Sequence, residues 1–280
     1  MSEKFQRLAI DFIRKKSTGD FEKNNHAITI NFHPDTVSAS GLSVLGAIAR
    51  DGEIKSQFET GTSNGGKSAF VGGDRWLWEQ RAFGGAYDNA DAKFRPKYGA
   101  LNYAGHAAGA SPRFGSSHFC LKPHVLSRCT FCYPDSYFEP KEFAIDECVK
   151  SLVDLADQAN TDPLDIYVEA HIHGEISLER DVECLVLDPA YRSTEIEEYA
   201  KQLKVQVQWH AGFNLSIDVM KLYPEYRGQA VIDLARNIAI ENQINPVILG
   251  QSVNHSNYDQ QSIKKIWHYL ARYGYNQQGA

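Results

Sequence analysis

Hydrophobic and polar residues alternate most clearly in the segment YVEAHIH, residues 167–173. Period-two alternation is typical of a β-strand, and here it places Val168, Ala170 and Ile172 on one face. The other face carries the aromatic ring of Tyr167, the carboxylate of Glu169 and the imidazoles of His171 and His173. This pattern predicts a strand that packs one face on a core and lines a cleft with the other. The alternative is an exposed antiparallel strand whose polar residues are solvated.

Periodicity along the rest of the chain predicts a mixture of helices and strands. Helices are expected over residues 3–17, 146–158, 193–203, 229–243 and 262–273, with a short helix or turn over 41–50. Strands are expected over 27–32, 54–60, 117–121, 129–133 and 205–210, and a hairpin at Gly174 is expected to place Glu183 on the strand beside Glu169. Residues 61–115 are rich in glycine and aromatics, which is typical of a long, ordered binding loop. The elements do not alternate regularly, so the predicted class is α+β.

Composition restricts the class of protein further. The chain has 280 residues, of which 42% are hydrophobic and 23% charged, as in a globular protein with a sizeable core. A net charge of −6 without a basic stripe argues against nucleic acid as the partner. Neither a signal-peptide-like segment nor an apolar run of membrane-spanning length is present, so no membrane association is expected. Five cysteines, an odd number, favour folding in the cytoplasm and leave open delivery to another cell without a cleavable signal.

Two motifs resemble a nucleotide-binding site and a metal-binding site, but the sequence around each of them does not support that function. Residues 61–68, GTSNGGKS, match the P-loop expression. The preceding segment is half polar, and the following Gly-Gly pair would interrupt a helix, which disfavours a phosphate-binding loop. Cys120, His124, Cys129 and Cys132 lie within 13 residues, but strand alternation sends Cys129 and Cys132 to opposite faces. Buried small side chains are therefore the favoured interpretation of these cysteines.

His171 and His173 face the same way and support a metal-dependent hydrolase as a second hypothesis. Glu169, Asp181 and His210 are the candidate further ligands. A serine hydrolase is disfavoured, since the chain has no G-x-S-x-G motif.

Several segments resemble a known family. FHPD (32–35), FETGTSNGG (58–66), RPKYGALN (95–102) and YVEAHIHG (167–174) look like motifs of a bacterial family of uncharacterised domains, over roughly residues 27–215. That family resembles the ADP-ribosyltransferase superfamily, which has a split β-sheet cleft. In the superfamily, an Arg or His lies on the first core strand, a Ser/Thr motif on the second and a Glu on a late strand.

The resemblance implies an α+β fold with an ADP-ribosyltransferase-like split β-sheet core and flanking helices. It also implies a mono-ADP-ribosyltransferase that uses NAD, releases nicotinamide and modifies a protein acceptor. In such a reaction a fixed carboxylate stabilises the positive charge that develops on the ribose. The implied domains are an N-terminal helix (1–25), a catalytic domain (26–215) and a C-terminal helical extension (216–280).

The same resemblance assigns roles to individual residues. Glu169 is the candidate catalytic carboxylate, and Glu183 is its rival because Asp181, two residues earlier, fits the superfamily pattern better than Tyr167 does. The implied NAD-binding residues are His33, Thr60, Thr62, Ser63, Arg75, Arg95 and Tyr98, with Trp76 as another ring that could stack on nicotinamide. Structural roles, such as a strand cap for His33, are the alternatives. A non-enzymatic ligand-binding module is the third functional hypothesis.

Overall fold

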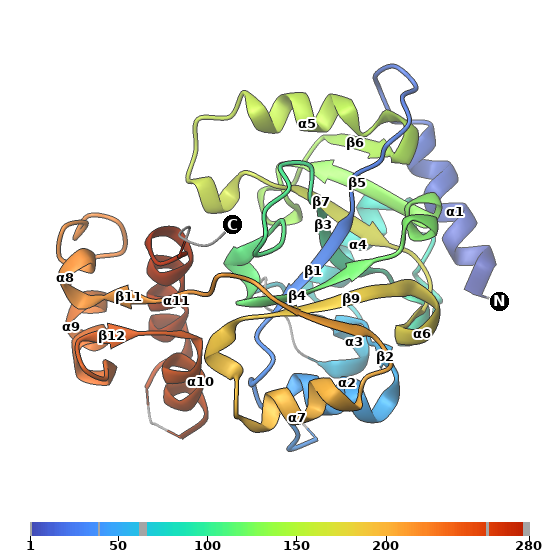
Figure 1. The fold of residues 1–280 in the computed structure, drawn as a ribbon. Coiled ribbons are helices and arrows are strands. Elements are labelled where there is room, and N and C mark those ends of the chain that lie inside the picture. The colour runs from blue at the N-terminus through green and yellow to red at the C-terminus, as the bar shows by residue number, and fades with distance from the viewer. Residues whose placement is uncertain (1, 39, 62–65, 256–257, 277–280) are drawn as a thin grey trace.

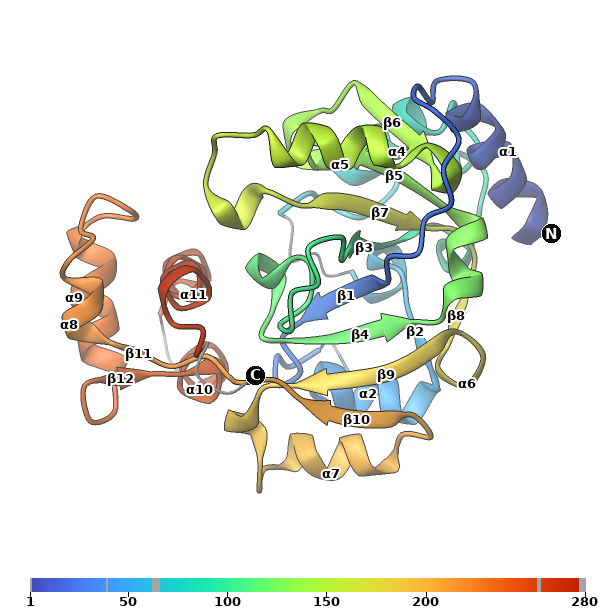
Figure 2. The same cartoon turned by 45° about the horizontal axis from the view of Figure 1, so that its top comes forward.

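One eight-stranded sheet organises the molecule. The computed structural model describes residues 2–38, 40–61, 66–255 and 258–276. The strand order is β10-β9-β4-β1-β3-β7-β5-β6, which Figure 2 shows from bottom to top. Only β9 and β10 pair in parallel among these described neighbours. The strands are β1 (Ile28–Phe32), β3 (Lys97–Leu101), β4 (Ser117–Leu121), β5 (Cys129–Tyr133), β6 (Glu142–Ile145), β7 (Val168–Ile172), β9 (Val182–Leu187) and β10 (Gln206–Trp209).

Helices flank this sheet, so the predicted α+β class is confirmed (Figure 1). α1 and α5 lie near the β5–β6 edge, and α2 and α7 lie together near the β9–β10 edge (Figures 1 and 2). No helix in the described ranges is long and apolar enough to cross a membrane. The helices of this part are α1 (Ser2–Arg14), α2 (Val44–Asp51), α3 (Gln57–Thr60), α4 (Asp74–Ala82), α5 (Lys150–Asp157), α6 (Leu178–Asp181) and α7 (Glu195–Gln202).

The sheet splits between β1 and β3. These strands pair only where Ile28 meets Leu101 and Thr29 meets Ala100. Beyond that point they diverge, and side chains from both strands line a cavity of about 500 Å³. Gly99 lies at the divergence, where a Cβ atom would be 2.6 Å from the carbonyl oxygen of Thr29. A side chain at this position would therefore push the two strands apart.

Two predictions in this region are wrong. Residues 54–60 do not form one strand, because β2 (Glu53–Ile54) ends early and α3 follows. Ser56 begins α3 through a capping box, in which its Oγ accepts from the Glu59 N–H at 3.2 Å. The Ser56 N–H donates in return to the Glu59 carboxylate at 2.8 Å. The expected loop over 61–115 likewise contains a helix, α4, and a strand, β3.

The predicted hairpin after Gly174 is also wrong. The strands beside β7 are β3 and β5, whereas β9 lies beside β4 and β10. After β7 the chain forms β8 (Ile176–Ser177), which pairs with β2, and then α6 before it enters β9. Glu183 therefore does not lie on the strand next to Glu169.

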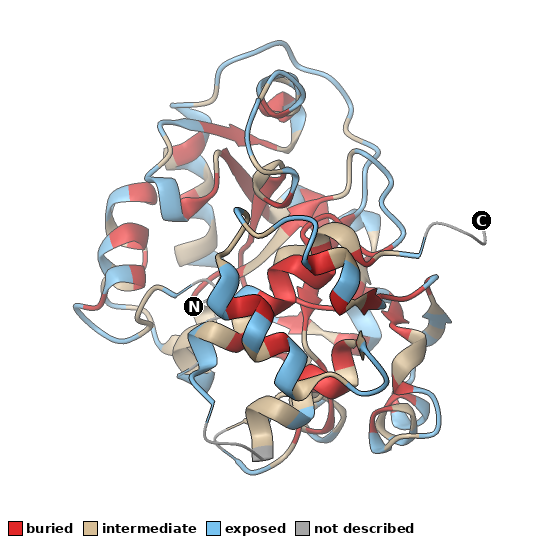
Figure 3. Cartoon of the chain, turned by 90° about the vertical axis from the view of Figure 1, so that its left-hand side faces the viewer, coloured by how far each residue is buried: buried red, intermediate tan, exposed pale blue. Residues whose placement is uncertain are grey.

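The C-terminal residues form a second hydrophobic cluster beside the main core. Its centre includes Phe213, Met220, Ile232, Ile266 and Trp267. The predicted helix over 229–243 ends at Ile238, and α10 was not predicted. Figure 3, which faces this part, shows buried and exposed segments alternating along the helices. The elements are β11 (Leu215–Ser216), α8 (Ile217–Met220), α9 (Gln229–Ile238), β12 (Gln243–Ile244), α10 (Pro246–His255) and α11 (Gln260–Tyr273).

Candidate active site

The cavity at the split brings together residues from distant parts of the sequence. Five of the residues expected from the sequence line it: His33, Thr60, Arg75, Tyr98 and Glu169. Thr62 and Ser63 lie outside the described residues. Thr60 lies at the end of a helix rather than on a core strand, so its expected setting is wrong. Arg95 and Glu183 do not line the cavity.

Glu169 lies on β7 with only 6% of its surface exposed. One carboxylate oxygen, Oε1, accepts from His171 Nε2 at 3.1 Å. The other, Oε2, accepts from the hydroxyl of Ser136 at 3.0 Å. Ser136 in turn accepts from an Arg75 guanidinium nitrogen at 2.8 Å. The carboxylate is thus held from both sides, which fixes its orientation in the cavity wall.

A chain of hydrogen bonds runs behind Glu169 into the core. Tyr87 Oη lies 2.7 Å from His173 Nδ1, and His173 Nε2 lies 2.9 Å from Thr130 Oγ1. Thr130 Oγ1 is also 3.1 Å from His171 Nδ1. One assignment of protons satisfies every group: each member donates to the next, from Tyr87 through His173, Thr130 and His171 to Glu169. We call this set of five residues the Tyr87–Glu169 relay.

The polar face of β7 is therefore divided between two environments. Tyr167 and Glu169 line the cavity. His171 and His173 are fully buried, and the Trp78, Phe83 and Tyr87 rings cover them. The alternative of an exposed strand is wrong, because every residue of β7 is buried.

The surroundings favour a negative charge on Glu169. Burial by itself would raise the pKa of Glu169, but the His171 hydrogen bond and the charge of Arg75 outweigh it and lower the pKa. Asp135 shows the opposite behaviour. Burial and the nearby Glu169 charge raise the pKa of Asp135, whose carboxylate accepts from the Tyr167 hydroxyl. The surroundings therefore favour ionisation at Glu169 more than at Asp135.

Arg75 and Tyr98 form the neighbouring wall. The Arg75 guanidinium lies over the Tyr98 ring, 4.1 Å from its centroid, and Arg75 is 3% exposed. The Nε of Arg75 is buried without a hydrogen-bond partner in the described structure. The Tyr98 hydroxyl donates to Glu79 at 2.8 Å. Arg95 donates to the other Glu79 oxygen at 2.6 Å and to the carbonyl of Tyr87 at 2.9 Å, which explains why it lies behind the cavity wall.

His33 lies at the end of β1, where the sequence places it before Pro34. Its ring meets the ring of Trp267 edge-on, with centroids 4.7 Å apart. Burial, together with the positive charge of Lys264, lowers the pKa of His33 to about 4. A neutral imidazole is therefore present in the cavity at neutral pH.

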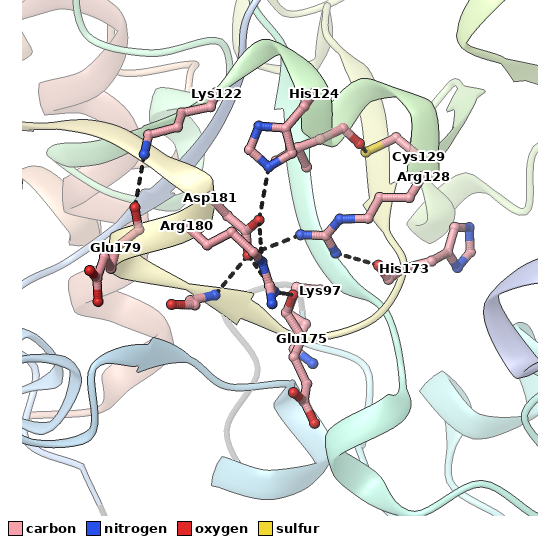
Figure 4. A network of polar contacts seen from close by, with 12 residues as sticks. Lys97, Lys122, His124, Arg128, Cys129, His173, Glu175, Glu179, Arg180 and Asp181 are labelled. Atoms are coloured by element: carbon pink, nitrogen blue, oxygen red, sulfur yellow. Dashed lines mark hydrogen bonds and ion pairs between the residues drawn. The ribbon is translucent and has the colours of Figure 1, made fainter. Parts of the chain in front are cut away.

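Asp181 and His210 do not assemble a metal site with the histidines of β7. Asp181 is buried among cations instead, as Figure 4 shows. Its carboxylate accepts from Arg180 at 2.8 Å and from His124 at 3.1 Å, and it lies 3.2 Å from Arg128. Arg128 also donates to the carbonyl of His173, so this network fixes the end of β7. The ring of His210 is hydrogen-bonded to backbone atoms of Ser116 and Gly212.

A different group offers metal-ligand atoms: Cys132, Glu169 and His171. Their candidate atoms lie within 4.8 Å of one another, and all three residues are buried. In the Tyr87–Glu169 relay, however, His171 Nε2 carries a proton and donates to Glu169. The nitrogen then has no lone pair for a metal ion. Cys129 is directed elsewhere, toward the carbonyl of Val125, as the opposite-face prediction requires.

The P-loop interpretation is also disfavoured by the described residues around it. The element before the motif is the helix α3, and the next helix, α4, begins only at Asp74. Lys67 makes an ion pair with Glu139 at 2.8 Å. The strand-loop-helix context that positions a phosphate is therefore missing from residues 53–61 and 66–82.

Several residues of the site were not expected from the sequence. Ser136 and Thr130 were not singled out, although Ser136 donates to Glu169 and Thr130 contacts His171. Glu79 could have been noticed, because its spacing of four residues from Arg75 places both on one face of a helix. The residues that α11 contributes to the cavity, Gln261, Lys264, Lys265 and His268, gave no local signal.

The fold and site define an α+β protein with a split sheet and a buried carboxylate in a cavity at the split. The chain belongs to the family described as "Protein of unknown function (DUF3626)", which matches residues 27–155 and 143–273. This confirms the predicted membership of an uncharacterised family. A comparison with curated proteins found no match. Among solved structures the chain is similar to DarT of Thermus sp. 2.9 in complex with NAD+, at 12% identity and a TM-score of 0.39, over 68% of this chain and 98% of that one.

Proposed function

We propose that this protein is a mono-ADP-ribosyltransferase that uses NAD as its substrate and a protein side chain as its acceptor. The observation that carries the proposal is the buried, negatively charged carboxylate of Glu169 in the wall of a cavity of about 500 Å³. That volume is within the range of ordinary small-molecule sites. The cavity also contains an arginine, Arg75, with a buried nitrogen that has no partner in the described structure.

The reaction needs a negative charge near the ribose. When the bond between nicotinamide and ribose breaks, its electron pair leaves with nicotinamide, and positive charge develops on the ribose. A nucleophilic atom of the acceptor then bonds to the same carbon and loses its proton. Glu169 would accept a hydrogen bond from the ribose 2′-hydroxyl and stabilise the positive charge as it develops. Its two fixed contacts, from His171 and Ser136, hold it ready for this role.

Other cavity residues would bind the rest of NAD. Arg75 would pair with the pyrophosphate through nitrogens that include the unpartnered Nε. His33 and Thr60 would contact the ribose hydroxyls. Tyr98 has one face covered by Arg75, so its first role would be to hold that guanidinium, and its free surface would contact the nicotinamide. Arg95 would not contact NAD, because its guanidinium is bound to Glu79 behind the cavity wall.

The test is nicotinamide release by the purified full-length protein, measured with labelled NAD and a cell lysate as the acceptor source. Glu169→Gln keeps the shape of the side chain and removes its charge. We expect it to slow release by about 10²- to 10³-fold. Glu183→Gln is the matched control, because Glu183 is exposed and outside the cavity. Equal release by the wild type and Glu169→Gln, or loss of release in Glu183→Gln alone, would contradict the assignment.

A further inference from the structure

Helix α11 forms one wall of the cavity. The indole N–H of Trp267 is shared between the carbonyl oxygens of Pro112 and Arg113, each at 3.0 Å. The Trp267 ring also meets His33 at the end of β1. These contacts fix α11 against the split sheet, so the residues that it directs into the cavity, among them Lys264 and His268, are part of a built wall.

His268 is the unexplained residue of this wall. Only 5% of its surface is exposed, yet neither ring nitrogen has a hydrogen-bond partner among the described residues. Arg227 lines the same cavity, and its Nε is also buried without a partner. Buried polar atoms are almost always hydrogen-bonded, and leaving them unpaired destabilises the fold. Two residues that line one cavity therefore carry unpartnered polar atoms, which points to a polar ligand.

The charge at this end of the cavity indicates the kind of ligand. Arg113, Arg227 and Lys264 lie close enough to His268 to reinforce the effect of burial, and together they lower the pKa of His268 to about 3. Two carboxylates, Asp162 and Asp165, oppose these cations. Asp162 is already paired with Arg272 at 2.7 Å and Arg227 at 3.5 Å, and Asp165 is paired with Arg113. The surroundings remain positive, and guanidinium and imidazole N–H groups both donate to phosphate oxygens.

We propose that His268 and Arg227 form a phosphate-binding subsite at the α11 side of the cavity. The inference deepens the proposed function and rests on it for the source of the phosphate. That source is either the diphosphate of NAD, which the subsite would then bind together with Arg75, or a phosphate group on the acceptor. In both cases the recognised chemistry is the same: phosphate oxygens that accept from a neutral imidazole and from a guanidinium.

The first experiment measures inorganic pyrophosphate binding to the full-length protein by titration calorimetry. His268→Phe keeps a ring and removes both nitrogens, and Arg227→Gln removes the charge. We expect each to weaken pyrophosphate binding about tenfold or more. Arg236→Gln is the control, since Arg236 is exposed and its partner Asp233 lies on the same helix.

Two outcomes would overturn the subsite. One is that the wild type binds no pyrophosphate, and the other is that binding is unchanged in both His268→Phe and Arg227→Gln. Thermal unfolding of each variant identifies a loss of folding. The two variants check each other, because Arg227 also pairs with Asp162, whereas His268 has no hydrogen-bond partner in the described part of the chain. Pyrophosphate binding with this mutational pattern, in a protein that never releases nicotinamide, would support the subsite and reject the proposed function.

Competition experiments separate the two sources of phosphate. If the NAD diphosphate occupies the subsite, pyrophosphate competes with NAD. Arg227→Gln then raises the KM for NAD measured in the absence of an acceptor. If the phosphate belongs to the acceptor, pyrophosphate leaves NAD binding unchanged and inhibits only transfer. Each result supports the subsite and assigns its natural occupant.

Discussion

His171 Nε2 lies 3.1 Å from the Oε1 of Glu169, two residues earlier on the same strand. The contact joins a fully buried imidazole to the carboxylate that lines the cavity. The Tyr87–Glu169 relay orients that imidazole, because Thr130 fixes which of its nitrogens carries the proton. The position and charge of Glu169 therefore depend on residues that do not reach the cavity.

Thr130→Val tests this dependence. Valine has nearly the shape of threonine but leaves His171 Nδ1 and His173 Nε2 without their partner. We expect a loss of about 1–3 kcal/mol in the free energy of unfolding. Nicotinamide release should fall about tenfold, and the acid limb of its pH profile should move to higher pH. The reason is that a weaker His171 hydrogen bond lets burial raise the pKa of Glu169.

Thr130→Ser provides the rescue for this prediction. Serine retains the hydroxyl, so the pH profile should return to that of the wild type even if stability does not. A Thr130→Val protein with an unchanged acid limb would show that the relay does not set the state of Glu169.

Local sequence signals predicted much of the fold. Alternation and helical periodicity located β1, β5, β7 and α7 to within a few residues, because each element buries one continuous apolar face. The sequence also contains a signal for the helix that replaces the predicted strand over 54–60, since Ser56 and Glu59 have capping-box spacing. Local patterns of this kind did not predict which strands are neighbours in the sheet. The pairing of β7 with β3 depends on contacts between residues about 70 positions apart in the chain.

The site was predictable only in part. Alternation on β7 identified Glu169, and the family resemblance added His33, Arg75 and Tyr98, which lie in the same cavity. The residues that hold Glu169 come from β5 and the turn after it, and no periodicity connects Ser136 to a strand 33 positions later. His268 comes from the C-terminal cluster, and only the docking of α11 brings it to the cavity.

Asp181→Asn should strongly destabilise the fold. Asp181 is buried and neutralises Arg128 and Arg180, so removal of its charge leaves these cations without a charged partner (Figure 4). Asp181 is buried, but Arg180 and His124 are more than half exposed, so we expect a cost of about 1–3 kcal/mol. The exposed pair of Asp154 and Lys150 provides the control, and Asp154→Asn should change stability by less than about 1 kcal/mol. Urea unfolding at pH 7 measures both, and similar losses would show that the network is not stabilising.

The Asp181 network should also weaken in acid. Burial opposes ionisation, but the hydrogen bonds from Arg180 and the Ser177 N–H prevail and lower the pKa of Asp181 below its ordinary value. Its folded pKa is thus below the unfolded one, so its stabilisation is present above about pH 4 and is lost as the pH falls toward the folded pKa. The difference between the wild type and Asp181→Asn should therefore shrink below pH 4.

Asp35→Asn should have the opposite pH dependence. Burial raises the pKa of Asp35 from 3.8 to about 6, although its carboxylate accepts from the Tyr191 hydroxyl at 3.0 Å. Because the folded pKa is raised, the contribution of Asp35 is favourable below about pH 4 and is lost as the pH rises through 6. Asparagine keeps an acceptor for Tyr191 and carries no charge.

The expected result is therefore a variant that matches the wild type near pH 4 and is more stable at pH 7.5, by up to about 3 kcal/mol. Urea unfolding at the two pH values measures this difference. The exposed Asp233→Asn serves as the control, with no such change. A stability difference for Asp35→Asn that is the same at both pH values would contradict the assignment.

Chelation distinguishes the transferase from the metal-dependent hydrolase. Cys132, Glu169 and His171 lie close enough to bind a metal ion. In the relay, however, His171 Nε2 carries a proton, and burial raises the pKa of the Cys132 thiol well above its ordinary value. A metal ion would have to remove both protons and reverse the hydrogen bonds through Thr130. We therefore expect nicotinamide release to survive dialysis against a chelator, and Cys132→Ser to retain it. One zinc per chain by elemental analysis, lost together with activity in Cys132→Ser, would replace the transferase proposal with the metal-dependent one.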